Sequence, residues 1–518
     1  MKLRHLTLHG FKNLDGLEVD FDSEFDTFVM LGGNGTGKSN LIEAIVSIFA
    51  DVDLRRAPSF TYQLSYECRK EDVLIKGKSG DPVPTVTVSR SQADLPRENE
   101  RTPDYLPDNI VAYYSGPGSR LETHFLDHRK REYEALRDPE KATYTPFLYC
   151  EPCYSDFLLL ACFGAGSFDI REFVSGRMGI REIESVLFDI VKPQRAPTRS
   201  RAIAKADGDE RFWDSTGEIA NILGLLSDNS LAPSRSTEAD ENDFRANTKK
   251  EHLFLFLQDQ DSLKRAARPF GESFGFFRQL CYLNTLGMVN DLTIKIHRRG
   301  QKKPFPFADF SEGERQLITI IGLLRMVSGG ESLILLDEPD THLNPRWKYD
   351  FLDILKQHAG DSSRNQVVIA THDPLVIGEL RKEQVLMFQQ DRETYQVEVQ
   401  HPLEDPIGQG VAGLLKSEMF GLPSTLDSHT TQKIHRRYEL YSMGDERTEE
   451  QTEEMHKIIG ELSLLGFATD YRDPYYEKFA KALSRRPEFK KPQLTAAERE
   501  DQEEIADEIL DEILGADG

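Results

Sequence analysis

Apolar residues along the chain follow two spacings, one typical of strands and one typical of helices. The segments LEVDF (17–21) and FVML (28–31) are short and alternating or continuously apolar, so they predict strands. SNLIEAIVSIF (39–49) spaces its apolar residues three and four positions apart, which predicts one buried face of a helix. The glycine-rich segment GGNGTGK joins the second strand to this helix. A strand that enters a helix through such a turn indicates an α/β fold.

The same order of elements returns late in the chain. Between about residues 119 and 308 the pattern instead predicts mostly helical segments broken by polar loops, and SLAPSRSTEADEND (230–243) is the most loop-like of these. After about residue 405 the pattern is helical again. Between about residues 308 and 405 the α/β order returns. We expect a helix at 314–327, a strand at 333–337, a helix at 345–357 and a strand at 366–371, followed by the strand-like segment QVLMFQQ.

Composition places the chain among globular proteins with more than one structural unit. It has 518 residues, 38% apolar and 29% charged, and no apolar run near the ~20 residues that a membrane span needs. Five cysteines without dense spacing, and a start that lacks the apolar core of a signal peptide, favour a reduced cytoplasmic setting without a membrane. The net charge of −24 argues against a general nucleic-acid coat, although KIHRRGQKK (295–303) is either a local basic patch or a solvated hairpin.

The glycine-rich turn matches the phosphate-binding pattern G-x-x-x-x-G-K-[ST]. Its glycines let backbone amides turn toward phosphate oxygens, and the following helix presents its positive end. The lysine would reach the β- and γ-phosphates of ATP, and the serine hydroxyl would ligate Mg²⁺. A purely structural glycine turn is the alternative, but the strand before the motif and the helix after it favour a nucleotide site. The residues expected to bind nucleotide are Gly32, Gly33, Asn34, Gly35, Thr36, Gly37, Lys38, Ser39 and Asn40.

Two acids end a second apolar strand. LILLDE (333–338) is a continuous apolar run, which predicts a buried strand, and it ends in Asp337 and Glu338. Asp337 would hold Mg²⁺ together with Ser39. Glu338 would act as the catalytic base that polarises a water in line with the γ-phosphate. Adjacent acids would repel each other without a cation, so a plain surface turn is the weaker interpretation.

A third apolar strand, in VVIATHDP (367–374), ends in His372. A histidine in isolation is more often structural. Because the two other motifs are present, we expect the imidazole of His372 to contact the γ-phosphate or to hold the attacking water, and we place it with Glu338 among the catalytic residues.

Three other sets of residues have the chemistry of ligands or docking elements. Cys150 and Cys153 in CEPC have metal-ligand spacing, but no second cysteine pair stands nearby, so a buried apolar role is favoured over zinc. His124 and His128 lie four apart on a predicted helix, where a solvated face is favoured over metal binding. The last 21 residues carry ten acids and predict an amphipathic helix, which docks either on the body of the protein or on a partner.

The motifs together resemble a known superfamily. The P-loop, FSEGERQL, LILLDEPDTHLNP and IATHDP occur in family order, and the start, LRHLTLHGFKNL, is similar to a first strand with its F-K/R-N step. The chain is identified as a member of the ABC-type ATPases of the SMC, Rad50, RecF and OLD branch. The resemblance implies an α/β P-loop head with lobes at 1–118 and 309–404, a compact, mostly helical insertion at 119–308, and a helical C-terminal region with an acidic tail at 405–518.

The resemblance also implies a role for the segment SEGE. In this superfamily the signature segment serves the ATP bound on a second subunit, so Ser311, Gly313 and Glu314 would contact that nucleotide at the positive start of a helix. Two ATP molecules would then join two protomers head to tail, with Asp340 and Asn344 in the loop that crosses the interface. SEGE replaces the SGGQ of transporters, which fits the non-transporter branch.

The sequence departs from the superfamily pattern at two positions. Asn344 stands where an aspartate is usual. The metal-sensing glutamine has no secure counterpart, because Gln63 is one candidate while the strand IVAYYSG is better placed and contains no glutamine.

Longer segments resemble a narrower group. FSEGERQLITIIGLLRM, DEPDTHLNPRWKYDFLDIL, THDPLVIGELRKEQVLMF and DYRDPYYEKFAKAL look like the PtuA-like ATPase subunits of Septu-type and retron-associated antiphage systems. In that group the ATPase works with a separate nuclease, often of the HNH type, and sometimes with a reverse transcriptase and its DNA. The implied function is an ATP-hydrolysing, Mg²⁺-dependent switch that controls the effector through ATP-dependent dimerisation. A DNA-repair ATPase of the RecF/Rad50 type, acting on nucleic acid directly, is the alternative.

Overall fold

The computed structural model divides the chain into two compact units. One comprises Met1–Val376 and Glu383–Gln400, and the other comprises Ile377–Lys382 and His401–Gly518. Each unit is described below by itself. The residues described are 1–89, 91–93, 103–137, 146–166, 168–193, 208–239, 249–358, 364–391, 394–444 and 447–465, with isolated positions after these.

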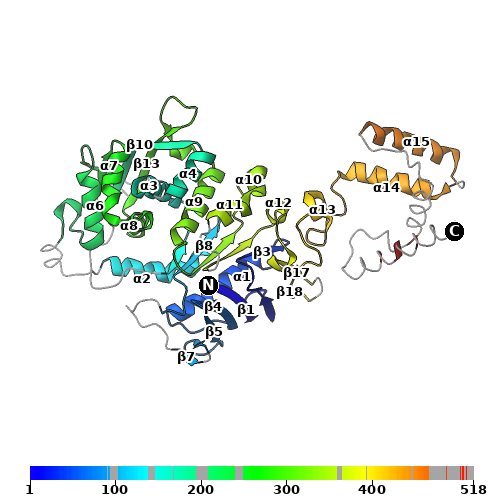
Figure 1. Cartoon of the computed structure of the whole chain (residues 1–518), viewed down its shortest axis with the longest axis horizontal. Helices are drawn as coiled ribbons and strands as arrows, with labels where there is room; N and C mark the ends of the chain where they lie inside the picture. Colours follow the sequence, from blue (N-terminus) through cyan, green and yellow to red (C-terminus); the bar gives the residue numbers. More distant parts are fainter. Residues whose placement is uncertain are drawn as a thin grey trace. The chain divides into compact units, whose positions relative to one another are not determined.

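A seven-stranded sheet forms the centre of the larger unit, in the order β18-β17-β3-β16-β15-β8-β9 (Figure 1). The strands from β17 to β9 pair in parallel, and β18 is antiparallel to β17. Because parallel strands share a carboxyl edge, the segments that follow β3, β15 and β16 meet there. The strands are β3 (Thr27–Gly32), β8 (Asn109–Tyr114), β9 (Phe147–Tyr149), β15 (Ser332–Asp337), β16 (Asn365–Ala370), β17 (Val385–Gln390) and β18 (Val397–Gln400).

Helix α1 (Lys38–Asp53) lies between this sheet and a second, antiparallel sheet. Its side chains from Leu41 to Asp53 are all buried, in one apolar core with residues of both sheets. Because α1 packs tightly against both sheets, its position is fixed, and the P-loop at its start is fixed with it. The second sheet has the order β2-β1-β4-β5-β6-β7 and contains β1 (Lys2–His9), β2 (Leu17–Asp20), β4 (Thr61–Cys68), β5 (Glu71–Gly77), β6 (Thr85–Val88) and β7 (Ser91–Ala93).

Helix α9 (Glu312–Val327) covers the opposite face of the seven-stranded sheet. Its apolar residues, such as Ile320 and Leu324, face Val111 of β8 and Ile334 of β15. The strands and the helix predicted around the three motifs are therefore confirmed. The helix predicted at 345–357 is two helices, α10 (Pro345–Tyr349) and α11 (Phe351–His358).

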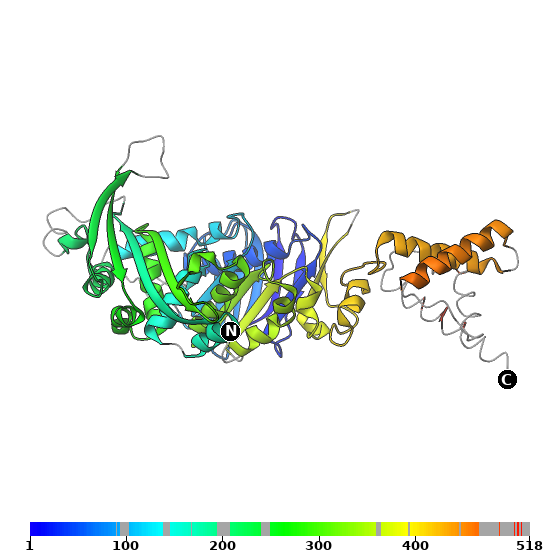
Figure 2. The same ribbon diagram turned by 90° about the horizontal axis from the view of Figure 1, so that it is seen from above.

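The insertion contains helices, as predicted, and also a sheet that the sequence pattern did not predict. The five antiparallel strands follow the order β11-β12-β10-β13-β14, and Figure 2 shows the long strands curving beside the helices. The strands are β10 (Ile180–Val191), β11 (Ser234–Ala239), β12 (Lys249–Leu257), β13 (Val289–Arg298) and β14 (Phe305–Pro306). The helices are α2 (Leu126–Leu136), α3 (Tyr154–Ala165), α4 (Phe168–Arg177), α6 (Gly217–Asp228), α7 (Gln260–Ala267) and α8 (Ser273–Thr285).

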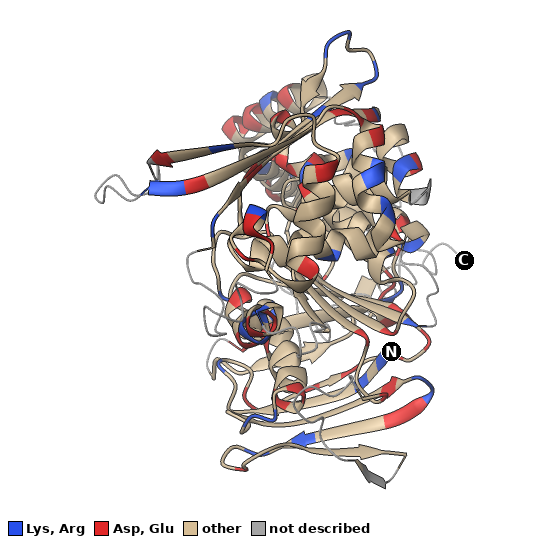
Figure 3. Ribbon diagram, turned by 90° about the vertical axis from the view of Figure 1, so that its left-hand side faces the viewer, with Lys and Arg blue, Asp and Glu red and all other residues tan. Residues whose placement is uncertain are grey.

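The physical reason for this sheet lies in the alternation of β10. Val186, Phe188 and Ile190 are buried and share one face of the strand, and α4 and α7 contact the strand. The loop predicted at 230–243 is wrong in part, because 234–239 forms an edge strand on β12, and the rest, from 240, lies outside the described residues. The segment 295–303 contains the end of β13 and the turn that leads to β14, so it is part of a hairpin. Lys and Arg are intermixed with Asp and Glu over the insertion (Figure 3).

The smaller unit is helical where it is described. It contains α13 (Gly410–Lys416), α14 (Ser428–Ser442) and α15 (Glu449–Leu464). The last two helices pack around Leu440, Met455, Ile458 and Leu462. The predicted acidic helix and the segment DYRDPYYEKF lie outside the described residues, apart from isolated positions in the tail. Within the described part of the chain, no helix has both the length and the apolar content that crossing a bilayer requires.

Candidate nucleotide-binding site

The P-loop lies between the end of β3 and the start of α1, and its glycines are required by the backbone. Gly32 and Gly37 have φ angles of 153° and 108°. A Cβ at Gly37 would lie 2.5 Å from the Leu14 side chain, and one at Gly32 would lie 2.6 Å from the Phe388 carbonyl. Both positions therefore need glycine for conformation and for space. Thr36 Oγ1 closes the loop by donating to the Gly33 carbonyl at 2.9 Å.

Lys38 is buried inside this loop. Its Nζ donates to the carbonyl of Gly32 at 2.7 Å and to that of Gly33 at 3.2 Å. Burial lowers the pKa of Lys38, while the nearby charges of Glu338 and Asp337 raise it. The ammonium group is therefore held at the start of α1, beside the two acids that the sequence predicted.

Asp337 and Ser39 meet across the sheet edge. Asp337 is 2% exposed, its pKa is raised to about 6 mainly by burial, and the Ser39 hydroxyl forms a hydrogen bond with it. Asp337 Oδ1 is buried and has no hydrogen-bond partner among the described residues. A buried carboxylate oxygen without a donor costs stability unless a cation meets it. This pair of oxygen ligands fits Mg²⁺, which binds carboxylate and hydroxyl oxygens in such sites.

Glu338 and His372 lie side by side because β15 and β16 are parallel and in register. Asp337 stands opposite Ala370, so the residues that follow each strand meet, and His372 Nδ1 lies 2.7 Å from Glu338 Oε2. Glu338 has a φ angle of 54°, which is uncommon for a residue other than glycine, and its amide donates to the Ala370 carbonyl at 2.8 Å. Such strained conformations gather at functional sites. His372 remains exposed, whereas Glu338 is mostly enclosed.

The signature residues form a separate group at the start of α9. Ser311 caps the helix in a capping box with Glu314, whose Oε2 accepts from the Ser311 amide at 3.0 Å. Gly313 is buried against the loop that follows β15, where a Cβ would lie 2.4 Å from the His342 carbonyl. Among the contacts of the described residues, none joins Ser311, Gly313 or Glu314 to the P-loop. The structure thus places the predicted residues in two groups.

The loop after Glu338 is packed against the body of the protein. Asp340 is fully buried, with Lys348 Nζ 3.8 Å away. Asn344 caps α10 by accepting from the Trp347 amide at 3.0 Å. In the single chain, the side chain of Asp340 therefore lies near Lys348 of the same chain, and Asn344 caps a helix.

Gln63 lies outside the sheet that carries Asp337. It lies on β4 in the six-stranded sheet, whereas Asp337 lies in the seven-stranded sheet. The strand of IVAYYSG is β8, which pairs with β15 and places Tyr114 opposite Asp337. The residue that follows this strand is Ser115.

Several polar residues beside the P-loop were not selected by the motifs. Asn13 Nδ2 donates to the Gly35 carbonyl at 3.0 Å, and Asn40 Nδ2 donates to Asn13 Oδ1 at 2.6 Å. Buried Glu43 on α1 pairs with Lys12 and with Arg120, the latter at 2.8 Å. The F-K-N step was a signal for Lys12 and Asn13, but nothing in the local sequence pairs Arg120 with Glu43.

The prediction of a solvated face at His124 and His128 is wrong. His128 is 1% exposed, and its Nε2 lies 3.1 Å from Asp53 Oδ2. His124 Nε2 lies 3.1 Å from Glu43 Oε2. The cause is α1, whose fully buried helix carries carboxylates that need partners from the neighbouring segment.

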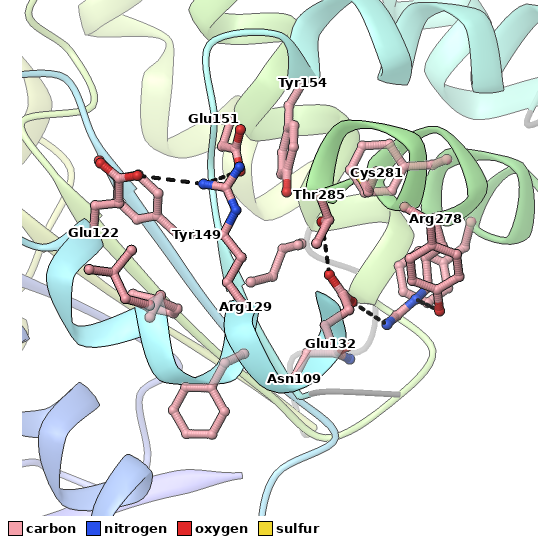
Figure 4. A pocket seen from close by; sticks show the side chains of 17 residues that line it. Asn109, Glu122, Arg129, Glu132, Tyr149, Glu151, Tyr154, Arg278, Cys281 and Thr285 are labelled. Atoms are coloured by element: carbon pink, nitrogen blue, oxygen red, sulfur yellow. Dashed lines mark hydrogen bonds and ion pairs between the residues drawn. The ribbon is translucent and has the colours of Figure 1, made fainter. Parts of the chain in front are cut away.

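A pocket outside this site lies between α2, β9 and α8 and is open to solvent (Figure 4). Its charged side chains pair with each other, since Arg129 binds Glu151 at 3.0 Å and Thr285 donates to Glu132 at 3.0 Å. Cys150 is buried close by, and no group of three or more metal-binding side chains occurs in the described part of the chain.

Comparisons with known families agree with this geometry. Residues 5–136 match a family described as an AAA domain, and residues 182–378 match one described as "AAA domain, putative AbiEii toxin, Type IV TA system". Fold, motifs and matches define the head of the chain as a P-loop ATPase domain of the AAA type.

Curated relatives narrow the comparison. The chain is 21% identical over 453 residues to the retron Vc95 probable ATPase of Vibrio cholerae serotype O1 biovar El Tor, covering 80% of this chain and 78% of that protein. It is 30% identical over 164 residues to the Septu protein PtuA of Bacillus mycoides (strain KBAB4), covering 30% and 22%. A RecF protein of Leptospira interrogans serogroup Icterohaemorrhagiae serovar copenhageni (strain Fiocruz L1-130) is 30% identical over 143 residues, covering 24% and 38%. The SMC head domain from Thermotoga maritima covers 77% of this chain and 99% of its own at 14% identity, with a TM-score of 0.34.

Proposed function

We propose that the protein is the ATP-hydrolysing switch subunit of an antiphage defence complex and that it controls a separate effector through ATP-dependent dimerisation. The observation that carries the ATPase part is the meeting of Lys38, Ser39 and Asp337 at one sheet edge, with Glu338 and His372 beside them. These groups come from three strands that are far apart in the sequence. A purely structural role would not require a buried lysine and two acids around an open glycine loop.

The roles of the residues follow from their positions. Lys38 and the amides of the P-loop would hold the phosphates, and Ser39 with Asp337 would hold Mg²⁺, which neutralises phosphate charge. Glu338 would accept a proton from the attacking water. His372, beside Glu338, would orient that water or contact the γ-phosphate.

Dimerisation is supported by the separation of the two groups of predicted residues. Ser311 and Gly313 stand at the start of α9, a helix end that attracts anions, and Ser311 is exposed. A second copy, turned head to tail, would bring its signature helix to the nucleotide of the first. Two such sites form in a symmetric pair.

The defence role is supported by the relatives. The retron ATPase matches along most of both chains, and the Septu protein matches over the shared head. We expect the effector to be a separate nuclease, most simply an enzyme of the HNH type. A reverse transcriptase and its DNA are further partners that the retron relative suggests.

A DNA-repair ATPase is the second candidate. The observation in its favour is the similarity to RecF, which is local and covers 24% of this chain. ATP-dependent affinity for DNA without any protein partner would favour this candidate over the first.

The test is a pull-down of the Glu338→Gln protein from its native host in the presence of ATP and Mg²⁺. Removing the base should lower turnover by about 10²- to 10⁴-fold while ATP stays bound. A nuclease or other toxic enzyme captured in stoichiometric amount supports the effector switch. Capture of DNA alone or of recombination proteins supports repair, and undiminished turnover contradicts the role of Glu338.

A further inference from the structure

Arg120 lies beside the P-loop although no motif contains it. It follows β8 after a short loop, and β8 pairs with the strand that ends in Asp337. Its Nη2 donates to Asn40 Oδ1 at 2.5 Å and to Glu43 Oε1 at 2.8 Å. Asn40 is the residue directly after Ser39, so the guanidinium reaches the first turn of the P-loop helix.

The carboxylate that Arg120 binds has other partners. Glu43 is almost fully buried, and it contacts the ammonium of Lys12 and the imidazole of His124, the latter at 3.1 Å. Burial raises the pKa of Glu43, but the hydrogen bonds from His124 and Lys12 and the charges of Lys12 and Arg120 outweigh it, so the pKa is lowered to about 2. Glu43 therefore keeps two partners if Arg120 turns away, and no buried charge is left unpaired.

We propose that Arg120 is a further residue of the ATP site, whose guanidinium binds the polyphosphate of the nucleotide held by the P-loop. Its side chain is 60% exposed while that of Glu43 is 3% exposed, so a ligand can reach the arginine without disturbing the core. A planar guanidinium suits phosphate oxygens, which accept two parallel hydrogen bonds. This inference rests on nucleotide binding, and it does not depend on the identity of the effector.

The place of Arg120 in the fold agrees with this assignment. The loop that carries Arg120 follows β8, whose last residue, Tyr114, stands opposite Asp337 in the sheet. The arginine would give this loop a polar contact with the nucleotide.

Arg131 offers a matched control, because it also pairs with a carboxylate of α1. Its Nη2 donates to Oδ2 of Asp53, the last residue of α1, at 2.5 Å, whereas Arg120 pairs with Glu43 near the start of the helix. The contact that Arg131 makes is to Asp53, and among the described residues no hydrogen bond or ion pair joins it to the P-loop or to Asp337. A structural clamp would show similar effects at both arginines, whereas a nucleotide contact would show its effect at Arg120 alone.

The experiment measures the Kd of the full-length protein for a fluorescent ATP analogue with Mg²⁺, together with the thermal midpoint. Arg120→Ala should weaken binding about tenfold or more, Arg120→Lys should recover part of the loss, and Arg131→Ala should stay within about twofold of the wild type. Unchanged affinity in Arg120→Ala, or an equal loss in Arg131→Ala, overturns the assignment. A wild-type protein that does not bind the analogue would instead overturn the proposed function as a whole.

Discussion

The phosphate side and the signature side of the head are built in opposite ways. Around the P-loop, Asp337 has a buried oxygen without a hydrogen-bond partner among the described residues, and Glu338 has a strained backbone. At the signature helix, Ser311 and Glu314 satisfy each other in a closed capping box. The first group is electrostatically incomplete without a cation, while the second is complete as a structure. The proposed function accounts for this difference if a ligand completes the first group and a second protomer brings the second group to its nucleotide.

Mixing two inactive variants tests this comparison most strongly. Lys38→Ala removes the phosphate contact and Ser311→Arg blocks the signature, so each variant alone should lose ATP turnover. In a mixed dimer one site combines the two intact halves, so up to about a quarter of the wild-type activity should return on mixing.

The measurement is steady-state ATP hydrolysis after the two proteins are mixed in equal amounts. The control is each variant mixed with itself at the same total concentration. Activity that stays at the level of the separate variants would mean that the two sides serve one protomer, and the comparison between them would fail.

Asp337→Asn should stabilise the protein in the absence of Mg²⁺. Burial raises the pKa of Asp337 from 3.8 to about 6, so the folded state favours the protonated carboxyl. The contribution of Asp337 to the free energy of unfolding is fully present at pH values below the pKa of this carboxyl in the unfolded chain, 3.8. It is lost as the pH rises through the folded-state pKa of about 6. At pH 7.5 the wild type should therefore lose roughly 2–3 kcal/mol that the asparagine variant keeps.

Urea unfolding with EDTA at pH 4 and pH 7.5 measures this difference. At pH 4 the two proteins should be nearly equal, which serves as the internal control, and added Mg²⁺ with ATP should favour the wild type. An asparagine variant that is less stable at pH 7.5 would show that Asp337 has a partner the structure does not contain.

Gly313→Ala should disturb the signature side by packing alone. The added Cβ would meet the His342 carbonyl at 2.4 Å, so α9 and the loop after β15 must separate, at a cost of about 1–3 kcal/mol. Gly329→Ala is the matched control, because a Cβ there meets no atom within 4 Å. Chemical unfolding measures the stability, and light scattering with ATP measures dimer formation. Equal stability of the two variants would contradict the close packing of Gly313.

The nucleotide-binding residues could be predicted from the sequence because each motif has a fixed spacing and directly follows an apolar strand. It did not predict the insertion sheet, since β10 and β12 pair across more than sixty residues and local pattern alone does not identify such partners. It also missed Glu43 and His128, because their burial depends on α1 lying between two sheets. Long-range packing decides those positions, and spacing along the chain does not contain that information.

The contact between the insertion and the signature helix gives the smallest expected effect. Arg298 of β13 donates to Glu314 Oε1 at 2.5 Å, and its guanidinium lies 4.6 Å from the centre of the Phe310 ring. Glu314 holds Ser311 through its other oxygen, so Arg298→Ala should loosen the capping box by about 1 kcal/mol without touching the P-loop. ATP affinity of the monomer should stay unchanged, while ATP-dependent dimerisation should weaken several-fold.

Arg299→Ala is the control for this last change, because the neighbouring arginine is exposed and bonds through its backbone amide to the Gly179 carbonyl. Dimerisation followed against protein concentration separates the two variants. If Arg298→Ala lowers the affinity of the monomer for ATP as well, the insertion acts on the phosphate side too, and the division of the head into two independent sides is wrong. If only dimerisation falls, the insertion sheet is a structural support of the signature, through which a partner bound to the insertion would change ATP-dependent pairing.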